Sequence, residues 1–427
     1  MGKITKTALF LLLPLLAIIS ALFLQKTIEA GADSKTTGKT VRVATEKQLK
    51  AALKSSKVSA IVFRTSSYKD MTITSSRSKK KTIVIDAPNA VITNTARFKK
   101  VEVINAKKYI EAVSGNTIKL SENSHLKVAD NVSVKKLVLT AVPIYYDIGK
   151  NGSIKSIKIA DKNHTGTFDK KTRTLTFDTV GIWTSYDPGQ YGTDEDLITE
   201  EYPINYTAVL DKSGRILKTY YKGRATERCD EYKYDENGNR IEWMQYDESV
   251  SEEVPAYRYE YIYEENRLVG ETDHSYDSDP VTYKKGYDKD GKLTASCNEG
   301  RYFREDVFYT YDDSALLIGE KTTKMWFTDE GTLSSRKSID IAYTYDRNGF
   351  LLTEDTYLID DHTKNIITYE YDKTKNPVRE IRISKRMYGL DNEMINMNYE
   401  IRYKYDELGV LTGIYYPDKD EDMSSDT

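Results

Sequence analysis

The stretch YKYDENGNRIEWMQYD, residues 232–247, carries the pattern that decides the fold of half of this chain. Tyrosines alternate with polar residues up to Tyr234 and Asp235, a glycine follows at Gly238, and Ile241 begins the next apolar positions. Asp at the start of a tight turn accepts hydrogen bonds from turn amides, and Gly adopts the positive φ that completes a bulged hairpin. The stretch therefore predicts one antiparallel β-hairpin.

The same pattern recurs through the second half of the chain. Tyrosine-acid pairs begin at Tyr234, Tyr263, Tyr287, Tyr311, Tyr345, Tyr371 and Tyr405, with a divergent first copy at Leu210. Glycine follows three residues after the acid at Gly214, Gly238, Gly291, Gly349 and Gly409. Repeats that are too short to bury an apolar face alone must pack on their neighbours. We therefore predict a continuous sheet of hairpins over residues 204–416.

This array resembles the YD-repeat family, also called the Rhs-like repeats, whose pattern is approximately Tyr-x-Tyr-Asp-x-x-Gly-Arg-Leu. The match is strongest in the copies around Asp235, Asp288, Asp346 and Asp406. The resemblance implies an extracellular adhesion or carbohydrate-binding protein, or a shell around toxic cargo. Eight copies are too few to close a shell, so a relative of polymorphic toxins that lacks cargo is one alternative.

The first half of the chain has a different repeat. Apolar pairs and triples recur roughly every 16 to 22 residues between polar turns, a spacing typical of stacked coils. Residues 131–139 (NVSVKKLVL) match residues 151–159 (NGSIKSIKI) at a shift of 20. Before them, Thr45 and Gln48 form a capping box for a short amphipathic helix with Leu49 on its apolar stripe.

These coils resemble the right-handed parallel β-helix found in pectate lyases and many secreted bacterial proteins. The resemblance covers residues 41–180, and the leading helix would cap the first coil. The aspartate cluster beside an arginine that serves the lyases is not visible, so their activity is not carried over. The sequence thus predicts an all-β protein: a short right-handed parallel β-helix with an N-terminal helical cap, followed by an antiparallel β-hairpin repeat sheet.

Charge divides the chain at the same place. Residues 33–180 hold 29 Lys and Arg against 12 Asp and Glu, a net charge of +17. Residues 181–427 hold 31 against 53, a net charge of −22. We therefore predict a basic β-helix-like domain at 33–180, an acidic connector at 181–203, a YD-repeat domain at 204–416 and a disordered tail at 417–427.

The start of the chain predicts an extracellular or cell-envelope location. Lys3 and Lys6 precede an apolar run, and Ala30 to Ala32 form a small-x-small site, as in a secretory signal peptide cleaved after residue 32. Contact with a membrane is expected only if this segment remains uncleaved.

Ligands and chemistry are less defined. The two cysteines, Cys229 and Cys297, and four scattered histidines fit no zinc spacing, and no catalytic motif is present. We expect no cofactor, no metal and no enzymatic activity; a carbohydrate-active enzyme or accessory module with a groove on the β-helix is the alternative. Nucleic acid is not expected as a partner, because the chain has a secretory signal and no recognition motif.

We expect binding at positions where the copies of the repeats differ from one another in sequence. Lysines at matching positions of successive coils would form a basic face for an anionic cell-wall polymer or polysaccharide. The repeated tyrosines are interpreted as sheet-pairing residues, whereas tryptophans outside the pattern are candidates for carbohydrate stacking. The candidate binding residues are Lys79, Lys80, Lys81, Lys99, Lys100, Lys135, Lys136, Trp243 and Trp326.

Overall fold

The computed structural model describes most of the chain after residue 38. The described residues are 39–121, 124–140, 146–160, 166–185, 198–222, 227–247, 254–274, 279–360, 363–388, 393–406 and 410–417, without the side chains of 178–204 and 384–399. The predicted signal peptide, Gly409 and all but the first residue of the predicted tail lie outside them. The described fold is all-β: a parallel solenoid of about six turns, followed by an antiparallel sheet of 18 strands.

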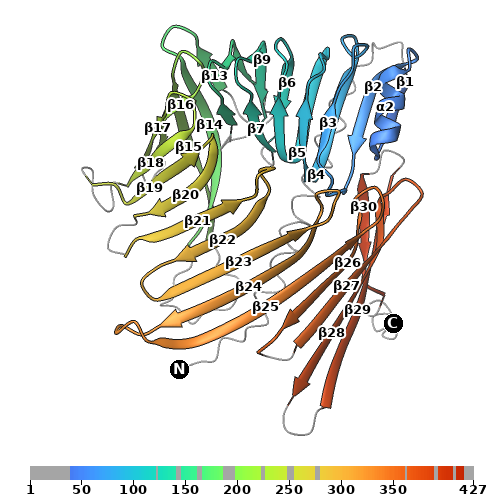
Figure 1. Ribbon diagram of the computed structural model, residues 1–427. Coiled ribbons are helices and arrows are strands. Elements are labelled where there is room, and N and C mark those ends of the chain that lie inside the picture. Colours follow the sequence, from blue (N-terminus) through green and yellow to red (C-terminus); the bar gives the residue numbers. More distant parts are fainter. Residues whose placement is uncertain are drawn as a thin grey trace.

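The solenoid forms the first half of the fold (Figure 1). Its elements are β1 (Lys39–Val43), α2 (Glu46–Lys54), β2 (Val58–Arg64), β3 (Met71–Ile73), β4 (Thr82–Asn94), β5 (Lys100–Glu111), β6 (Thr117–Leu120), β7 (Ser124–Val128), β8 (Ser133–Val134), β9 (Lys136–Leu139), β10 (Tyr146–Ile148), β11 (Ser153–Ile154) and β12 (Ile157–Ile159). One face runs β1-β2-β4-β5-β6-β9-β12, and every described pairing in the solenoid is parallel.

The register confirms the 20-residue repeat. Ile154 pairs with Val134, Ile157 with Leu137 and Ile159 with Leu139. The inward-facing column that contains Ile157 and Leu137 continues through the preceding coils. Its further members are Ile118, Val101, Ile83 and Ile61, all of which are buried. Burying such a side chain stabilises the fold by about 1.5 to 3 kcal/mol. A ladder of like aliphatic side chains therefore holds successive coils together.

The N-terminal helix caps the first coil, as predicted. Thr45 accepts a hydrogen bond from the backbone of Gln48, and the Gln48 side chain accepts one from the backbone of Thr45. Leu49, Ala52 and Leu53 are buried in the solenoid core. The helix thus covers apolar edges that the first coil would otherwise expose to water.

The second half is one sheet in which every strand pairs with its sequence neighbours. Its strands are β13 (Gly166–Asp169), β14 (Thr174–Ser185), β15 (Ile198–Leu210), β16 (Ile216–Lys222), β17 (Glu227–Tyr234), β18 (Arg240–Asp247), β19 (Tyr257–Glu264), β20 (Arg267–Asp273), β21 (Val281–Tyr287), β22 (Leu293–Glu299), β23 (Phe303–Tyr311), β24 (Leu317–Phe327), β25 (Leu333–Tyr345), β26 (Leu351–Leu358), β27 (Thr363–Tyr371), β28 (Pro377–Tyr388), β29 (Glu393–Tyr405) and β30 (Leu411–Tyr415). Cys229 in β17 and Cys297 in β22 are both free.

The predicted hairpin turns are present at the expected glycines. Gly214, Gly238, Gly291 and Gly349 have φ between 81° and 98°. In the turn of residues 235–239, the Asp235 carboxylate accepts hydrogen bonds from the backbone amides of Asn237 and Asn239, at 2.9 and 2.8 Å. Local turn chemistry therefore sets the register of each hairpin.

The sheet begins before the position at which the composition changes. Strands β13 and β14 pair over residues 166–177, and β14 continues across residue 181 to Ser185. The 181–203 segment, expected to be a connector, contributes the end of β14 and the start of β15. The side chains of Leu175, Phe177 and Tyr206 join the solenoid core, so the first hairpins close the last coil with apolar residues although their neighbours are acidic.

The sheet curves back so that its edge of tyrosine-acid turns meets the solenoid twice (Figure 1). At the last coil, the backbone amide of Ile154 donates to the Ser213 carbonyl at 2.9 Å, and the Tyr146 hydroxyl donates to the Gly214 carbonyl at 2.8 Å. At the first coil, the backbone amide of Tyr68 donates to the Gly349 carbonyl at 2.8 Å.

Spacing explains why the sheet must bow between these contacts. Coils and strands both stack about 4.8 Å apart. Each hairpin advances the sheet by two strands, or about 10 Å, whereas each coil advances the solenoid by one step. Over the interval from Gly214 to Gly349 the sheet is therefore about twice as long as the solenoid beside it. The excess length leaves space between the two halves.

Candidate functional site

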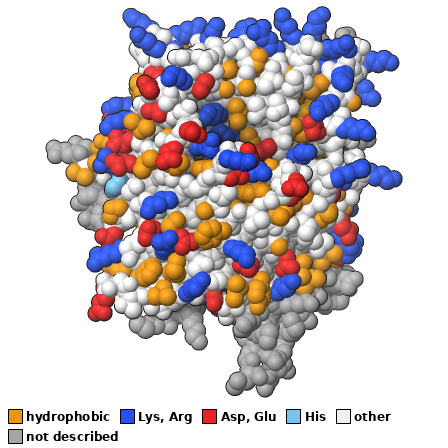
Figure 2. All heavy atoms as spheres, in the orientation of Figure 1, with side chains coloured by type: hydrophobic (Ala, Val, Ile, Leu, Met, Phe, Trp, Pro, Cys, Tyr) orange, Lys and Arg blue, Asp and Glu red, His pale blue; other side chains and the backbone are white. Residues whose placement is uncertain are grey.

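Five exposed lysines lie along one corner of the solenoid on four of five consecutive coils, with Asn116 at this position on the remaining coil, and we call them the lysine ridge. They are Lys79, Lys80, Lys99, Lys135 and Lys155. Backbone hydrogen bonds place Lys99, Lys135 and Lys155 in one column: the Lys99 amide donates to the Lys81 carbonyl at 2.8 Å, the Lys135 amide to the Asn116 carbonyl at 2.9 Å, and the Lys155 amide to the Val134 carbonyl at 3.0 Å. Lys79 and Lys80 immediately precede Lys81, which holds the column position on their coil. Within the described part of the chain, no ion pair engages these five side chains. Figure 2 shows Lys and Arg side chains along the border formed by the solenoid.

Lys81 does not belong to this ridge, although the sequence places it beside Lys80. Its side chain is buried, and its ammonium donates hydrogen bonds to the carbonyls of Ser55 and Val58 at the end of the helical cap. Burial lowers the pKa of Lys81. The residue therefore ties the cap to the second coil and is not available to a polymer.

Lys100 and Lys136 lie one position further along, at the start of strands β5 and β9. Lys100 is half-buried and pairs with Glu102 at 3.0 Å, so its charge is already compensated. Lys136 is half-buried beside Lys135 and adds to the ridge. The structure thus brings most of the predicted lysines together at one corner. The two exceptions are Lys81, which is buried, and Lys100, which is paired with Glu102.

The two candidate tryptophans lie far from the lysine ridge, on the sheet. Trp243 in β18 stacks on Tyr259 in β19, with ring centroids 4.8 Å apart and an interplanar angle of 19°. Trp326 at the end of β24 is 36% exposed and pairs across the strands with Phe303. Trp243 is thus engaged in cross-strand packing, whereas Trp326 presents part of its ring to solvent.

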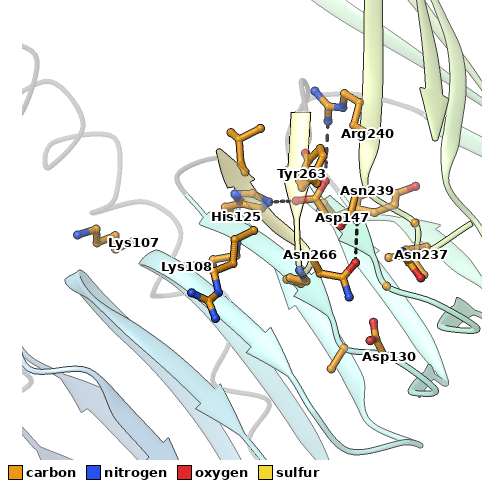
Figure 3. Close-up of a pocket in the computed structure, with 18 of the residues that line it drawn as sticks. Lys107, Lys108, His125, Asp130, Asp147, Asn237, Asn239, Arg240, Tyr263 and Asn266 are labelled. Atoms are coloured by element: carbon orange, nitrogen blue, oxygen red, sulfur yellow. Dashed lines mark hydrogen bonds and ion pairs between the residues drawn. The ribbon is translucent and has the colours of Figure 1, made fainter. Parts of the chain in front are cut away.

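A cavity of about 1160 Å³ lies between the solenoid and the bowed part of the sheet. One wall comes from the ends and bends of β5, β7 and β10, and the other from the turns and strands of β17 to β22. The cavity appears as a hollow with basic side chains at its bottom in Figure 2, and Figure 3 shows its walls.

The side chains of His125, Asp147 and Arg240 join the two walls of this cavity (Figure 3). His125 Nε2 lies 2.7 Å from Asp147 Oδ2, and Arg240 Nη2 lies 3.9 Å from Asp147 Oδ1. Burial raises the pKa of Asp147, but the hydrogen bond and charge of His125 and the charge of Arg240 more than offset this, and the pKa lies below its ordinary value. Asp147 therefore remains ionised at neutral pH.

More cations surround this group. Lys127 in β7 lies opposite Asp147 on the neighbouring strand β10, and Lys108 lies in β5, which pairs with β7 on its other side. Burial lowers the pKa of Lys108, the charge of Lys127 lowers it further, and Asp147 raises it. Lys107 and Arg267 complete the basic lining. The cavity carries these cations although Arg240 and Arg267 come from the acidic half of the chain.

The sheet wall also supplies aromatic rings and amides. Tyr261, Tyr263 and Tyr287 line it, and burial raises the pKa of each. The Asn239 amide donates to Asn266 Oδ1 at 3.0 Å, and Asn237 and Asn239 belong to the turn held by Asp235. The repeat motif thus builds part of the cavity from its own turn residues.

The sequence did not indicate this cavity. His125 and Asp147 belong to no motif. Their coils stack with a step of 20 residues, which places Asp147 opposite Lys127, and His125 lies two residues before Lys127 on the same face of its strand. Arg240 reaches them only because the turn at Gly238 docks on the last coil, close to the Ile148 carbonyl. The register of the coils could have indicated that His125 and Asp147 lie close together. No sequence pattern indicated that the sheet would bring Arg240 to them.

Comparisons with known proteins add little. No family model matches the sequence, and no curated protein matches it. Among the solved structures that match is a porin-like protein from Bacteroides uniformis, 7% identical over 54% of this chain and 95% of that one, with a TM-score of 0.26. A similarity of this degree carries no argument about fold or function.

Two further observations concern membrane spans and metal ligands among the described residues. None of their helices is both long and apolar enough to span a membrane. Within the same residues, His, Cys, Asp and Glu form no group of three suited to a metal ion.

Proposed function

We propose that this protein is a non-enzymatic binding protein of the extracellular space or cell envelope, which attaches to anionic cell-wall polymers or acidic polysaccharides through the lysine ridge. The observation that carries the proposal is the row of exposed lysines without ion-pair partners in the described structure, present on four of five consecutive coils. The four coil steps from Lys80 to Lys155 span about 19 Å, so a single polymer chain can contact several ammonium groups at once.

The electrostatics favour an extended anion over a compact one. Each exposed charge contributes at most about 1 kcal/mol and is screened within about 10 Å at ordinary ionic strength. Useful affinity therefore requires several contacts along a polymer that carries a repeating negative charge. The five ridge lysines are all exposed, which leaves them open to such a ligand.

The sheet supports a second part of the proposal, kinship with YD-repeat proteins. Successive hairpins share a tyrosine-acid pair, a carboxylate that accepts turn amides, and a residue of positive φ. With the apolar signal-like segment at the start of the chain, this supports an extracellular adhesion protein in which the solenoid binds the surface and the sheet projects from it.

Binding to poly(glycerol phosphate) and to polygalacturonate, measured at low and high salt, tests the ridge. Lys79, Lys99, Lys135 and Lys155 are changed together to Gln. Four contacts of about 0.4 kcal/mol each sum to about 1.6 kcal/mol, so the affinity should fall about tenfold. The remaining binding should also depend less on salt.

A matched control removes the same charge elsewhere. Lys289, Lys321, Arg336 and Lys337 are exposed residues in the second half of the chain, and their joint change to Gln should alter the affinity less than about twofold. Equal losses in both variants would show a net-charge effect and would contradict the ridge. Release of shortened polymer products by the wild-type protein would contradict the non-enzymatic assignment.

A further inference from the structure

We propose that the cavity between the solenoid and the sheet is a separate binding site for a short acidic saccharide, such as an oligosaccharide of uronic acids. The site is distinct from the lysine ridge. The ridge is an open corner of the solenoid, whereas the cavity is formed by both halves of the molecule.

The first support is the size and placement of the cavity. Sites for small ligands in proteins are concave and span about 300 to 1,000 Å³. At about 1160 Å³, this cavity can accept a ligand of several sugar rings. It exists because the sheet is longer than the solenoid between their two points of contact, so it belongs to the architecture of the fold.

The second support is charge. Lys107, Lys108, Lys127, Arg240 and Arg267 face two carboxylates, Asp130 and Asp147, which gives the lining a net charge of +3 when His125 is neutral. One of the carboxylates is already engaged, because Asp130 Oδ1 accepts a hydrogen bond from the Lys150 amide at 3.0 Å. A partly enclosed site with this excess attracts an anion more strongly than an open surface does.

The third support is the pairing of aromatic rings with amides. Tyr263 and Tyr287 offer apolar ring area with a polar edge, which suits the apolar face of a sugar. Asn237 and Asn266 offer amide donors and acceptors for hydroxyl groups. A small inorganic anion would need the cations alone; the combination indicates an acidic sugar.

Asp147 acts as an internal anion in this site. It lies beside Arg240 and Lys127 and accepts the hydrogen bond of His125, so a ligand carboxylate must compete with it for the same positive groups. Asp147 is therefore a residue that sets affinity for anions. Removing its charge should strengthen binding, which is the opposite of what damage to a site produces.

The experiment compares a tetramer of galacturonic acid with a neutral glucose tetramer by titration calorimetry. Wild-type protein should bind the acidic tetramer and not the neutral one. Changing both Lys108 and Arg267 to Gln should weaken binding at least about tenfold. Asp147→Asn should strengthen it about threefold or more at low salt.

Two controls separate this site from the ridge. The joint change of Lys321 and Arg336, exposed residues of β24 and β25, to Gln removes the same charge outside the cavity and should leave tetramer binding unchanged. The ridge variant with four Gln substitutions should also bind the tetramer normally, even if polymer binding is lost.

The thermal unfolding midpoint of each variant shows that it is folded. The proposal is overturned if the acidic tetramer binds no tighter than the neutral one, if the ridge variant loses tetramer binding, or if Asp147→Asn weakens it. Because the ridge and the cavity are tested with different ligands and variants, either result stands without the other.

Discussion

The Tyr371 hydroxyl donates a hydrogen bond of 2.9 Å to the carbonyl of Leu351, the first residue of the return strand β26 in the preceding hairpin. The same bond joins Tyr234 to Ile216 and Tyr287 to Leu268, each at 2.8 Å. In these three copies the tyrosine of the tyrosine-acid pair ties its own hairpin to the one before it. This explains why the motif uses tyrosine where phenylalanine would pair equally well across the strands.

Removing one of these hydroxyls should weaken the sheet. For Tyr371→Phe we expect a loss of about 1 kcal/mol in the free energy of unfolding, because a half-buried carbonyl loses its partner. Urea denaturation measures the change. Tyr357→Phe is the control: Tyr357 lies on the neighbouring strand β26, is 39% exposed, and should change stability by less than about 0.5 kcal/mol. Equal effects at the two positions would contradict the role of the hydroxyl.

The degenerate turns carry conformational strain that can be relieved. Ala315 has φ of 65° in the turn that follows Tyr311, at the place where other copies have glycine. A non-glycine residue in this region costs about 1 kcal/mol. Ala315→Gly should therefore stabilise the protein by roughly that amount, measured by the denaturation midpoint. Gly291→Ala should do the reverse, because its φ is 82° and no atom lies within 3.5 Å of the added methyl group. Destabilisation by Ala315→Gly would contradict this account.

Gly349 combines the same backbone requirement with a close contact between the two halves. A methyl group there would lie 2.8 Å from Lys69 Cβ and 2.9 Å from Ser67 Oγ on the first coil. Gly349→Ala should thus cost more than Gly291→Ala, by about 1 kcal/mol or more, because the coil and turn must separate.

Limited proteolysis within residues 65–70 measures that separation. Cleavage should rise in Gly349→Ala and not in Gly291→Ala. Identical stabilities and cleavage rates in the two variants would show that the contact is not formed in solution.

A buried carboxyl should make the solenoid sensitive to pH. Glu111 is inaccessible to solvent and accepts hydrogen bonds from Tyr109 Oη at 2.8 Å and Asn116 Nδ2 at 3.0 Å. Burial raises its pKa from 4.5 to about 7, although these hydrogen bonds oppose the shift. Between these two pH values the folded protein keeps a proton that the unfolded chain has released. The contribution to stability is therefore fully present below pH 4.5 and is lost as the pH rises to about 7.

The shift in the pKa of Glu111 corresponds to a contribution of at most about 3 kcal/mol to the free energy of unfolding. Glu111→Gln carries no titrating group, so the difference in unfolding free energy between wild type and variant should change across this pH range. Denaturation at pH 4.5, 6 and 7.5 measures it. A constant difference would show that Glu111 titrates normally in the folded state.

Much of the architecture was predictable because its causes are local. Gly238 and Asp235 form a turn from their own chemistry, and Leu49 faces the core because its helix has an apolar stripe. Stacking then follows from repetition, as the pairing of Ile154 with Val134 shows. Where burial depends on the path of a distant segment, sequence reasoning failed: Lys81 lies among exposed lysines in sequence but is buried beneath the end of the cap.

The cavity was not predictable for a related reason. His125, Asp147 and Arg240 are separated along the chain. His125 and Asp147 lie on stacked coils of the solenoid, whereas Arg240 comes from the sheet. Their meeting depends on where the sheet first touches the solenoid and on how far it bows before it touches again.

The two repeats, the hairpin turns, the helical cap and the opposite charges of the two halves could all be predicted from the amino-acid sequence, because each follows from residues that are close in the chain or one repeat apart. The tertiary structure alone decided which lysines remain exposed and that a cationic cavity exists. Strands and coils advance by the same distance, but a hairpin takes two such steps for each step of the solenoid. That difference in length curves the sheet and creates the space between the two halves.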